Sequence, residues 1–405
     1  MLDHPRLRLA PRMSRLRPSP TAEISQRLRR LAAEAREVIN LGEGELDFDT
    51  PVHVRRAAHD AIERGETKYT SVAGTQVLRE AIRDKLHNEN GLDYTLDEII
   101  AGPGAKPLIL DALMATVSPG DEVIIPAPHW VSYPDMARLA DGEPVILPCD
   151  AASDWKPTPE RLAAALTPKS RWLVLNSPNN PTGAILTAEE LSALARVLAP
   201  YPDVLVLCDD IYEHIRYDGL PFATMPEVEP ALKSRCVVIN GVSKAFSMTG
   251  WRLGYAAGPA PLIKAMETLQ SQSSTNASSI SQAAAVAALR EERDFMDEWL
   301  TTLDERRHIV LEAIERAPGL ACGRPQGAFY AYIDCSGLIG RKRPDSDVIK
   351  TDGDVAAWIL DASGVGLIPG AAFGTSPYLR LAYAVDTDVL RRAMQGIVDA
   401  CKQLG

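Results

Sequence analysis

Lys244 and Arg252 stand in a segment of mostly small residues, 241–254, with apolar runs on both sides of it. A lysine amine in apolar surroundings forms a Schiff base with a carbonyl compound, and an arginine guanidinium binds phosphate or carboxylate. The pair suits a carbonyl cofactor that is held covalently and carries a phosphate, and pyridoxal phosphate is such a cofactor. Taken alone, the two residues also fit an ordinary surface loop.

Carboxylate and amide side chains follow two other apolar runs. Cys208, Asp209 and Asp210 follow residues 204–207, with Tyr212 close behind. Asn180 lies in a Ser-Pro-Asn-Asn-Pro-Thr-Gly string that also fits a tight turn. A buried carboxylate is costly unless it is paired, and the ring N–H of pyridoxal phosphate is a suitable partner. Such an ion pair keeps the ring protonated and makes it an electron sink.

Further segments contain residues that bind anions. Small residues at 102–106 precede a predicted helix, and the free N–H groups and dipole at a helix start bind phosphate. Arg380 lies among apolar residues, and a buried arginine needs an anion, either an internal carboxylate or a substrate. Gly42 and Gly44 allow a ligand to approach the backbone closely, although a plain turn also explains them.

An α/β fold is expected to position these residues. Short runs rich in valine, isoleucine and leucine do not alternate with polar residues, which is typical of strands buried on both faces. The runs lie at 98–100, 123–125, 172–175, 204–207, 237–239 and 254–256. Helices predicted at 104–117, 187–199 and 259–272 separate several of them, which predicts a mostly parallel sheet with the ligand at the strand ends. Residues 282–317 are predicted to form one long helix.

Length and composition narrow the class of protein. A chain of 405 residues favours two domains. The formal net charge of −11 disfavours nucleic acid and anionic membranes as partners, and no apolar run approaches the length of a membrane span. The six cysteines show no paired or metal-ligand spacing, which favours a reducing, cytoplasmic location and no metal site. The arginine-rich N-terminus is interpreted as a basic arm that packs on the body or on a partner subunit.

The segments 177–183, 209–214 and 241–254 resemble, in order and spacing, those of the class I and II aminotransferases. The resemblance extends from about Arg17 to the C-terminus and is most specific to the bacterial aspartate branch, including members that also act on prephenate. It implies a fold-type I transferase that depends on pyridoxal phosphate. The expected domains are an arm with part of the small α+β domain, the large cofactor-binding α/β domain and the rest of the small domain, at 1–48, 49–290 and 291–405.

The resemblance also implies a role for each cofactor residue. Lys244 would form the Schiff base, Asp209 would pair with the ring nitrogen, and Trp130 would stack on the ring. Tyr212 and Asn180 would bond the phenolic oxygen. Lys244, Asp209 and Tyr212 are therefore the expected catalytic residues. The residues expected to surround the phosphate are Gly104, Ala105, Lys106, Ser243, Arg252 and, across a homodimer interface, Tyr69.

For the substrate, the resemblance implies that Arg380 and the backbone N–H of Gly44 bind the α-carboxylate, beside Trp130 and Asn180. Arg17 stands where close relatives carry a lysine. It is expected either to bind the distal carboxylate of a dicarboxylic substrate or to be a plain surface arginine. The sequence departs from the family pattern at three places, with Leu46 for proline, Pro107 for glutamine and His129 for an aromatic residue.

The implied reaction is transamination between an L-amino acid, with aspartate as the expected donor, and 2-oxoglutarate. Prephenate or an aromatic substrate is one alternative, and a pyridoxal-phosphate lyase on the same fold is another. A requirement for a keto acid acceptor distinguishes transamination from lyase chemistry. The expected partners are an amino acid, a 2-oxo acid and a second copy of the chain, without nucleic acid or membrane.

Overall fold

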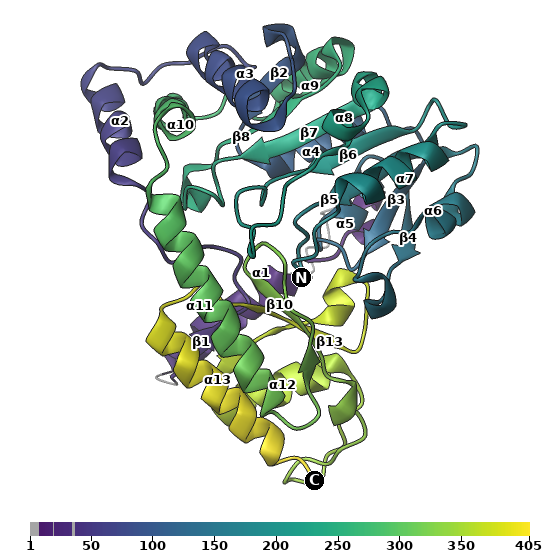
Figure 1. The fold of residues 1–405 in the computed structure, drawn as a ribbon, viewed down its shortest axis with the longest axis vertical. Helices are drawn as coiled ribbons and strands as arrows, with labels where there is room; N and C mark the ends of the chain where they lie inside the picture. Colours follow the sequence, from purple (N-terminus) through teal and green to yellow (C-terminus); the bar gives the residue numbers. More distant parts are fainter. Residues whose placement is uncertain (1–7, 19, 35–36) are drawn as a thin grey trace.

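The computed structural model describes residues 8–18, 20–34 and 37–405, which form a large and a small unit (Figure 1). The large unit is built on a seven-stranded sheet. In spatial order its strands are β2 (Ile99–Gly102), β8 (Gly254–Ala257), β7 (Cys236–Gly241), β6 (Leu205–Asp209), β5 (Ser170–Asn176), β3 (Glu122–Ala127) and β4 (Glu143–Pro148). Neighbours pair in parallel except at β8, which is antiparallel to both β2 and β7. The mostly parallel sheet predicted from the sequence is therefore confirmed.

Burial explains why these short runs form strands. Every residue of β2, β7 and β8 is buried, so these strands carry continuous apolar sequence instead of alternation. The strand β4 was not predicted from the sequence, because it is a half-exposed edge strand that contains Pro144 and ends at Pro148. Proline is tolerated at a sheet edge, where no neighbouring strand needs its missing N–H.

Helices cover both faces of the large sheet. Successive strand residues, such as Ile99 and Ile100, face two different apolar layers. One layer is covered by α4 (Ala105–Met114), α5 (Tyr133–Leu139) and α9 (Ala260–Ser273). The other is covered by α3 (Gln76–Asn90), α6 (Pro159–Ala165), α7 (Ala188–Leu198), α8 (Met225–Val228) and α10 (Ser279–Arg290), with α2 (Val52–Glu63) packed on α10.

Local sequence sets the ends of several helices. The Thr75 hydroxyl accepts a hydrogen bond from the backbone N–H of Leu78 at the start of α3, and Gly91 ends that helix with a φ of 63°. A capping box between Thr187 and Glu190 begins α7.

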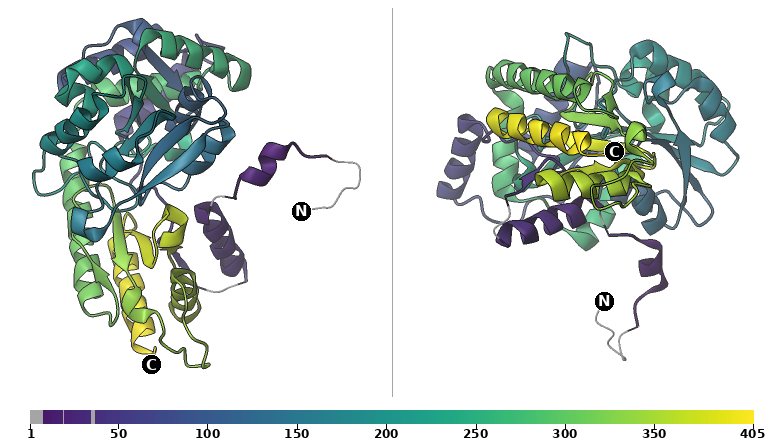
Figure 2. Two further views of the ribbon diagram at one scale, coloured as in Figure 1. Left: turned by 90° about the vertical axis from the view of Figure 1, so that its right-hand side faces the viewer. Right: turned by 90° about the horizontal axis from the view of Figure 1, so that it is seen from below.

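The small unit has its own sheet and its own apolar core. Its antiparallel strands are β12 (Ile368–Pro369), β13 (Tyr378–Ala382), β10 (Tyr330–Asp334) and β9 (Ala321–Cys322), and a parallel pair is formed by β1 (Ile39–Asn40) and β11 (Val365–Gly366). Its helices are α1 (Pro20–Ala33), α11 (Phe295–Glu315), α12 (Asp352–Ser363) and α13 (Thr387–Lys402). Figure 2 shows α11, α13 and α12 side by side. The exact domain limits, at 48/49 and 290/291, stay a prediction that the two separate cores support.

Residues 282–317 do not form the single helix predicted, because residues 291–294 separate α10 from α11. In this break Arg293 donates hydrogen bonds to Glu89 and lies 5.5 Å from the ring centre of Phe246. These tertiary contacts override local helix propensity. The break lets α11 leave the large unit and run into the small one (Figure 1).

The N-terminal segment forms a short 3₁₀ helix, η1 (Pro11–Arg15), beside α5. There the guanidinium of Arg15 pairs with the carboxylate of Asp141 at 2.5 Å. Among the described residues, no helix has the length and apolar character needed to cross a membrane.

Candidate active site

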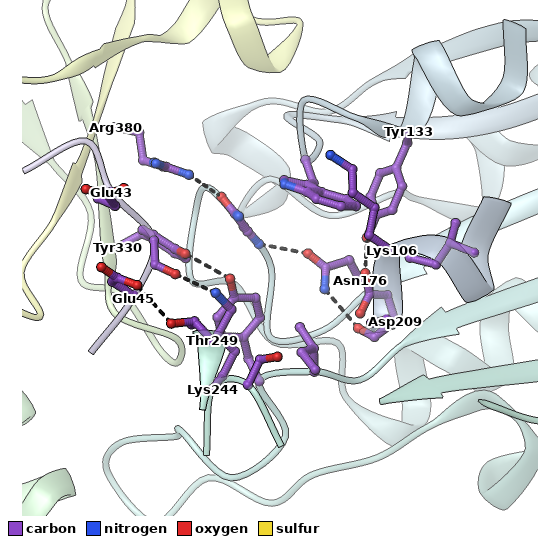
Figure 3. Close-up of a pocket in the computed structure, with 18 of the residues that line it drawn as sticks. Glu43, Glu45, Lys106, Tyr133, Asn176, Asp209, Lys244, Thr249, Tyr330 and Arg380 are labelled. Carbon is purple, nitrogen blue, oxygen red and sulfur yellow. Dashed lines mark hydrogen bonds between the residues drawn. The ribbon is translucent and has the colours of Figure 1, made fainter. Parts of the chain in front are cut away.

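A pocket of about 440 Å³ lies at the carboxyl ends of β5, β6 and β7, where the small unit meets the large one (Figure 3). The large unit contributes Asn176, Asp209 and Lys244 from these strand ends, and the small unit contributes Tyr330 and Arg380 from β10 and β13. The sequence-predicted residues that line this pocket are Gly44, Ala105, Lys106, Trp130, Asn180, Asp209, Tyr212, Ser243, Lys244, Arg252 and Arg380.

Lys244 follows β7 and carries its amine into the pocket. Its Nζ donates a hydrogen bond to the carbonyl oxygen of Gly44, and the ring centres of Tyr212 and Phe329 lie 5.8 and 5.9 Å from it. Burial, together with the positive charge of Arg380, lowers the pKa of the Lys244 amine to about 8. A substantial fraction of this amine is therefore neutral near pH 8, as a nucleophile or a general base requires.

Asp209 is the last residue of β6 and is 5% exposed. Its Oδ2 accepts a hydrogen bond from the hydroxyl of Tyr133 at 2.5 Å, while its buried Oδ1 has no partner among the described residues. Burial raises the pKa of the Asp209 carboxyl to about 6. A buried carboxylate oxygen without a partner fits a ligand that brings an N–H group, and a cationic ring nitrogen fits best.

The start of α4 and the side chain of Arg252 form a cradle for an anion. Gly104 precedes α4 with a φ of 104°, and a Cβ atom there would lie 2.6 Å from Nη2 of Arg252. Burial, together with the charge of Arg252, lowers the pKa of the Lys106 amine, and its Nζ lies 5.0 Å from the ring centre of Trp130. The start of a helix beside two cations fits a phosphate group at this place.

Arg380 forms the opposite side of the pocket from Lys106 and Asp209 (Figure 3). It is 2% exposed, and its Nη1 and Nη2 donate to Asn180 Oδ1 at 3.0 Å and to the carbonyl oxygen of Gly42 at 2.5 Å. Its Nε has no partner within the described part of the chain, where no carboxylate pairs with this guanidinium. An internal acid is therefore not its partner, and the site fits an incoming carboxylate.

Three predicted residues lie outside the pocket. Gly104 supports Arg252 from behind the pocket wall. Tyr69 is 88% exposed, and Arg17 is an exposed residue of a separate groove that also contains Lys106 and Pro107. Within one chain, neither Tyr69 nor Arg17 lines the pocket, although the groove of Arg17 shares Lys106 with it.

Two of the departures from the family pattern are packing residues in this fold. Leu46 is buried in the core of the small unit. His129 is 6% exposed, and its Nδ1 lies 3.0 Å from the carbonyl oxygen of Trp130, so its ring takes a packing role beside the site.

Of the polar pocket residues without a role assigned from the sequence, three contact Asp209 or Tyr212. Tyr133 bonds Asp209, and the Asn176 amide donates to the backbone carbonyl of Asp209 at 2.8 Å. The hydroxyl of Tyr330 lies 2.8 Å from that of Tyr212. The strand-end position of Asn176 was a usable signal, whereas the contacts of Tyr133 and Tyr330 form only when distant segments meet.

A model of the family described as aminotransferase class I and II matches residues 36–397. The chain belongs to the class I and II aminotransferases. An aspartate aminotransferase of Rhizobium meliloti (strain 1021) is 48% identical to it over 98% of this chain and 96% of that protein. An aspartate/prephenate aminotransferase of Cereibacter sphaeroides is 47% identical over 98% of this chain and 99% of that protein. The crystal structure of an aspartate aminotransferase from Rhizobium meliloti matches with a TM-score of 0.96 at 48% identity, covering 98% of this chain and 100% of that one.

Membership in the class I and II aminotransferases confirms the predicted fold class, the enzyme class and the cofactor, pyridoxal phosphate. The pocket fits this cofactor in two respects. The unpartnered Oδ1 of Asp209 suits the ring N–H, and the cradle at Gly104 and Arg252 suits the phosphate. The roles of the individual residues stay predictions.

Proposed function

We propose that this aminotransferase transfers the amino group of L-aspartate to 2-oxoglutarate. The observation that carries the proposal is Arg380, a buried guanidinium with an unpartnered Nε and no carboxylate partner among the described residues. Such a guanidinium binds a substrate carboxylate through parallel N–H bonds. Relatives at 47–48% identity are named aspartate aminotransferase, which favours aspartate among the amino acids.

Bound pyridoxal phosphate supplies a protonated ring that accepts the electron pair left at the substrate α-carbon. Lys244 would hold the aldehyde carbon of the cofactor through its Nζ in the resting enzyme. While it is neutral, the Lys244 amine would act as the general base that takes the proton from the substrate α-carbon and would hold that proton on its Nζ. The lowered pKa of Lys244 supports this role because it keeps part of the amine neutral near pH 8.

The other pocket residues would hold and orient the reactants. Asp209, steadied by the hydroxyl of Tyr133, would accept a hydrogen bond from the ring N–H and keep that nitrogen protonated. Tyr212 and Asn180 would bond the phenolic oxygen, and Trp130 would cover one face of the ring. Ser243, Arg252, Gly104 and the backbone N–H groups of Ala105 and Lys106 would surround the phosphate.

We also propose that two copies of the chain form a homodimer with a shared active site. The support is the position of Tyr69, which is 88% exposed and outside the pocket of its own chain. Its predicted contact with the phosphate therefore requires a second copy.

The six free cysteines support a reducing, cytoplasmic location.

The amino donor is tested with a panel of amino acids against 2-oxoglutarate, read as keto acid formation. We expect the highest kcat/KM for aspartate, and no activity with aspartate would refute the proposed donor. Prephenate as amino acceptor is the second candidate, because a relative at 47% identity is named for it. Omitting the keto acid tests the lyase alternative, since only a lyase continues to turn over without it.

A further inference from the structure

Residues 42–50, here called the strap, join β1 to α2 without regular secondary structure of their own. The inner end of the strap lines the active-site pocket. The carbonyl oxygen of Gly42 accepts a hydrogen bond from Arg380, and that of Gly44 accepts one from Lys244. The position of the strap therefore affects both the carboxylate-binding arginine and the reactive lysine.

Arg306, on α11 of the small unit, holds the outer half of the strap. Its Nη1 and Nη2 donate to the two carboxylate oxygens of Asp47 at 2.6 and 2.9 Å, and its Nε donates to Thr387 on α13 at 3.1 Å. The guanidinium also lies 5.3 Å from the ring centre of Phe48, which stacks on Trp299 at 4.7 Å. The Arg306 side chain is only 5% exposed, so this fork holds Asp47 in one orientation.

The large unit holds the strap from the other side, through residues that follow Lys244. The hydroxyl of Ser247 donates to the carbonyl oxygen of Phe48 at 2.5 Å, and the hydroxyl of Thr50 donates to the carbonyl oxygen of Ser247 at 2.7 Å. Thr249 donates to the carboxylate of Glu45 at 2.8 Å. The strap is thus tied to both units at once, with the pocket between the two attachments.

Leu46 makes the strap depend on these side-chain contacts. A leucine leaves its backbone φ free to rotate, whereas a proline would fix it. The Leu46 side chain is buried in the small-unit core, which anchors the strap but does not orient the next residue, Asp47. The orientation of the strap comes from the fork of Arg306 on Asp47.

We propose that Arg306 is a positioning residue of this aminotransferase, acting through Asp47 to fix the strap and so to place Gly42 and Gly44 against Arg380 and Lys244. The inference rests on the proposed carboxylate-binding role of Gly44 and Arg380. Without the fork, the strap keeps its apolar anchor and its bonds to Ser247 and Thr249 but loses its fixed orientation toward the small unit. Substrate binding weakens more than the chemical step, because Lys244 itself stays on the rigid end of β7.

Arg306→Met tests the proposal, and Arg307→Met is its matched control. Arg307 is the next residue of α11, has a fully buried side chain and forks onto Asp218 at 2.9 and 3.0 Å, away from the strap. Hydrogen exchange of the holoenzyme, followed by mass spectrometry, is the first readout. We expect amides of the strap to exchange about tenfold faster in Arg306→Met than in wild type, and to exchange at the wild-type rate in Arg307→Met.

Steady-state kinetics with the best amino donor is the second readout. We expect Arg306→Met to raise KM about tenfold while kcat stays within about threefold of wild type, because uniform binding is lost. Arg306→Lys keeps the charge without the planar fork, so it restores only part of the binding.

Unchanged exchange of the strap in Arg306→Met, or the same KM increase in Arg307→Met, would overturn the proposal. If Arg306→Met does not fold, Asp47→Asn removes the same ion pair from the strap side and must give the same two effects. The exchange readout needs no amino-acid substrate, so it separates failure of this inference from failure of the proposed aspartate specificity.

Discussion

Lys244 needs a neutral amine to hold an aldehyde and to carry a proton, and an exposed lysine is almost fully charged at neutral pH. In this fold, burial of Lys244 and the positive charge of Arg380 together lower the pKa of the Lys244 amine to about 8. Burial also raises the pKa of Asp209 to about 6, and one of its carboxylate oxygens has no partner in the described part of the chain. In the protein alone, burial disfavours the charged form of both residues, whereas the cofactor offers an aldehyde to Lys244 and a ring N–H to Asp209.

Lys244→Ala removes the residue that is proposed both to attach the cofactor and to act as the general base. We expect the turnover number to fall by at least about 10³-fold, within the range that proton transfer and nucleophilic attachment supply. The visible absorbance of the Schiff base is expected to disappear in the same variant. Lys264→Ala, at a lysine whose side chain is 75% exposed, is the control and should keep both properties. Transamination retained in Lys244→Ala would contradict the assigned role.

Asp209→Asn is expected to stabilise the cofactor-free enzyme while it removes activity. Asparagine can still accept the hydrogen bond from Tyr133 but carries no buried charge. The pKa shift of Asp209 from 3.8 to about 6 corresponds to about 3 kcal/mol in the free energy of unfolding. Thermal unfolding of the cofactor-free chain at pH 7.5 should therefore give a higher Tm for the variant than for wild type. The cofactor-loaded variant should lose most of its turnover, because the proposed partner of the ring nitrogen is gone.

The pH dependence of this stabilisation has a defined sign. The folded Asp209 carboxyl keeps its proton up to about pH 6, whereas the unfolded chain releases it near 3.8. Between these values the folded state binds more protons, so its stability falls as the pH rises. The advantage of Asp209→Asn is complete above pH 6 and shrinks toward pH 4. An advantage that is equal at pH 4.5 and pH 7.5 would show that buried charge is not its cause.

Sequence could identify the residues that carry the chemistry because strand ends place them predictably. Lys244, Asp209 and Asn180 each follow an apolar run, and the structure brings all three to one pocket. Tyr133 was not predictable in this way, because its bond to Asp209 joins residues 76 positions apart. Tyr330 likewise reaches Tyr212 only because the two units meet, and no local pattern encodes that meeting.

At the scale of elements, α4 combines two tasks, since it packs on the sheet and points its first N–H groups at the cradle. The close approach of Gly254 to the backbone of Ala105 and of Gly104 to Arg252 leaves no room for side chains at either glycine. The helices 104–117 and 259–272 predicted from the sequence correspond to α4 and α9. The edge strand β4 was less predictable because it buries too little to leave a continuous apolar pattern, whereas the other edge strand, β2, is fully buried and was predicted.

Gly104→Ala tests the cradle. The Cβ atom of the alanine would displace Arg252, and the alanine backbone would have to keep a φ of 104°, which is strained for any residue but glycine. We therefore expect the dissociation constant for pyridoxal phosphate to rise at least about tenfold. Gly65→Ala is the matched control, since Gly65 also has a positive φ, 74°, but no neighbour within 4 Å of the added atom. The control should lower the Tm through backbone strain and leave cofactor affinity unchanged. Similar cofactor affinity in both variants would argue against a phosphate at the cradle.

At the scale of the whole molecule, the pocket needs both units, and two predicted site residues lie outside it. Arg380 and Gly44 come from the small-unit side, and Lys244 and Asp209 come from the large one. Tyr69 and Arg17 lie outside this pocket, so the sequence resemblance names them while a single chain does not use them. If the two residues act in a second copy, as proposed, local patterns cannot supply such information, because it depends on how the two copies dock.

A shared site predicts that the enzyme in solution has twice the chain mass of 44.0 kDa. Light scattering behind a sizing column measures this mass directly. Tyr69→Phe should keep that mass and weaken pyridoxal phosphate binding by about tenfold or more, the loss expected for one hydrogen bond to a charged group. A monomeric enzyme with full activity would refute the shared site.

Arg17, in the N-terminal arm, has two possible roles, which a substitution can distinguish. It is either a ligand for the distal carboxylate of a substrate or a plain surface arginine. If a second copy places Arg17 at the pocket, Arg17→Ala should raise KM for aspartate by about tenfold or more, because a charge-assisted hydrogen bond is lost. An aromatic amino donor has no distal carboxylate, so its KM should stay near the wild-type value. Arg12→Ala, at another exposed arginine of the same arm, should change neither KM. An equal effect of Arg17→Ala on both donors would make Arg17 a packing residue of the arm and leave the distal carboxylate to another cation.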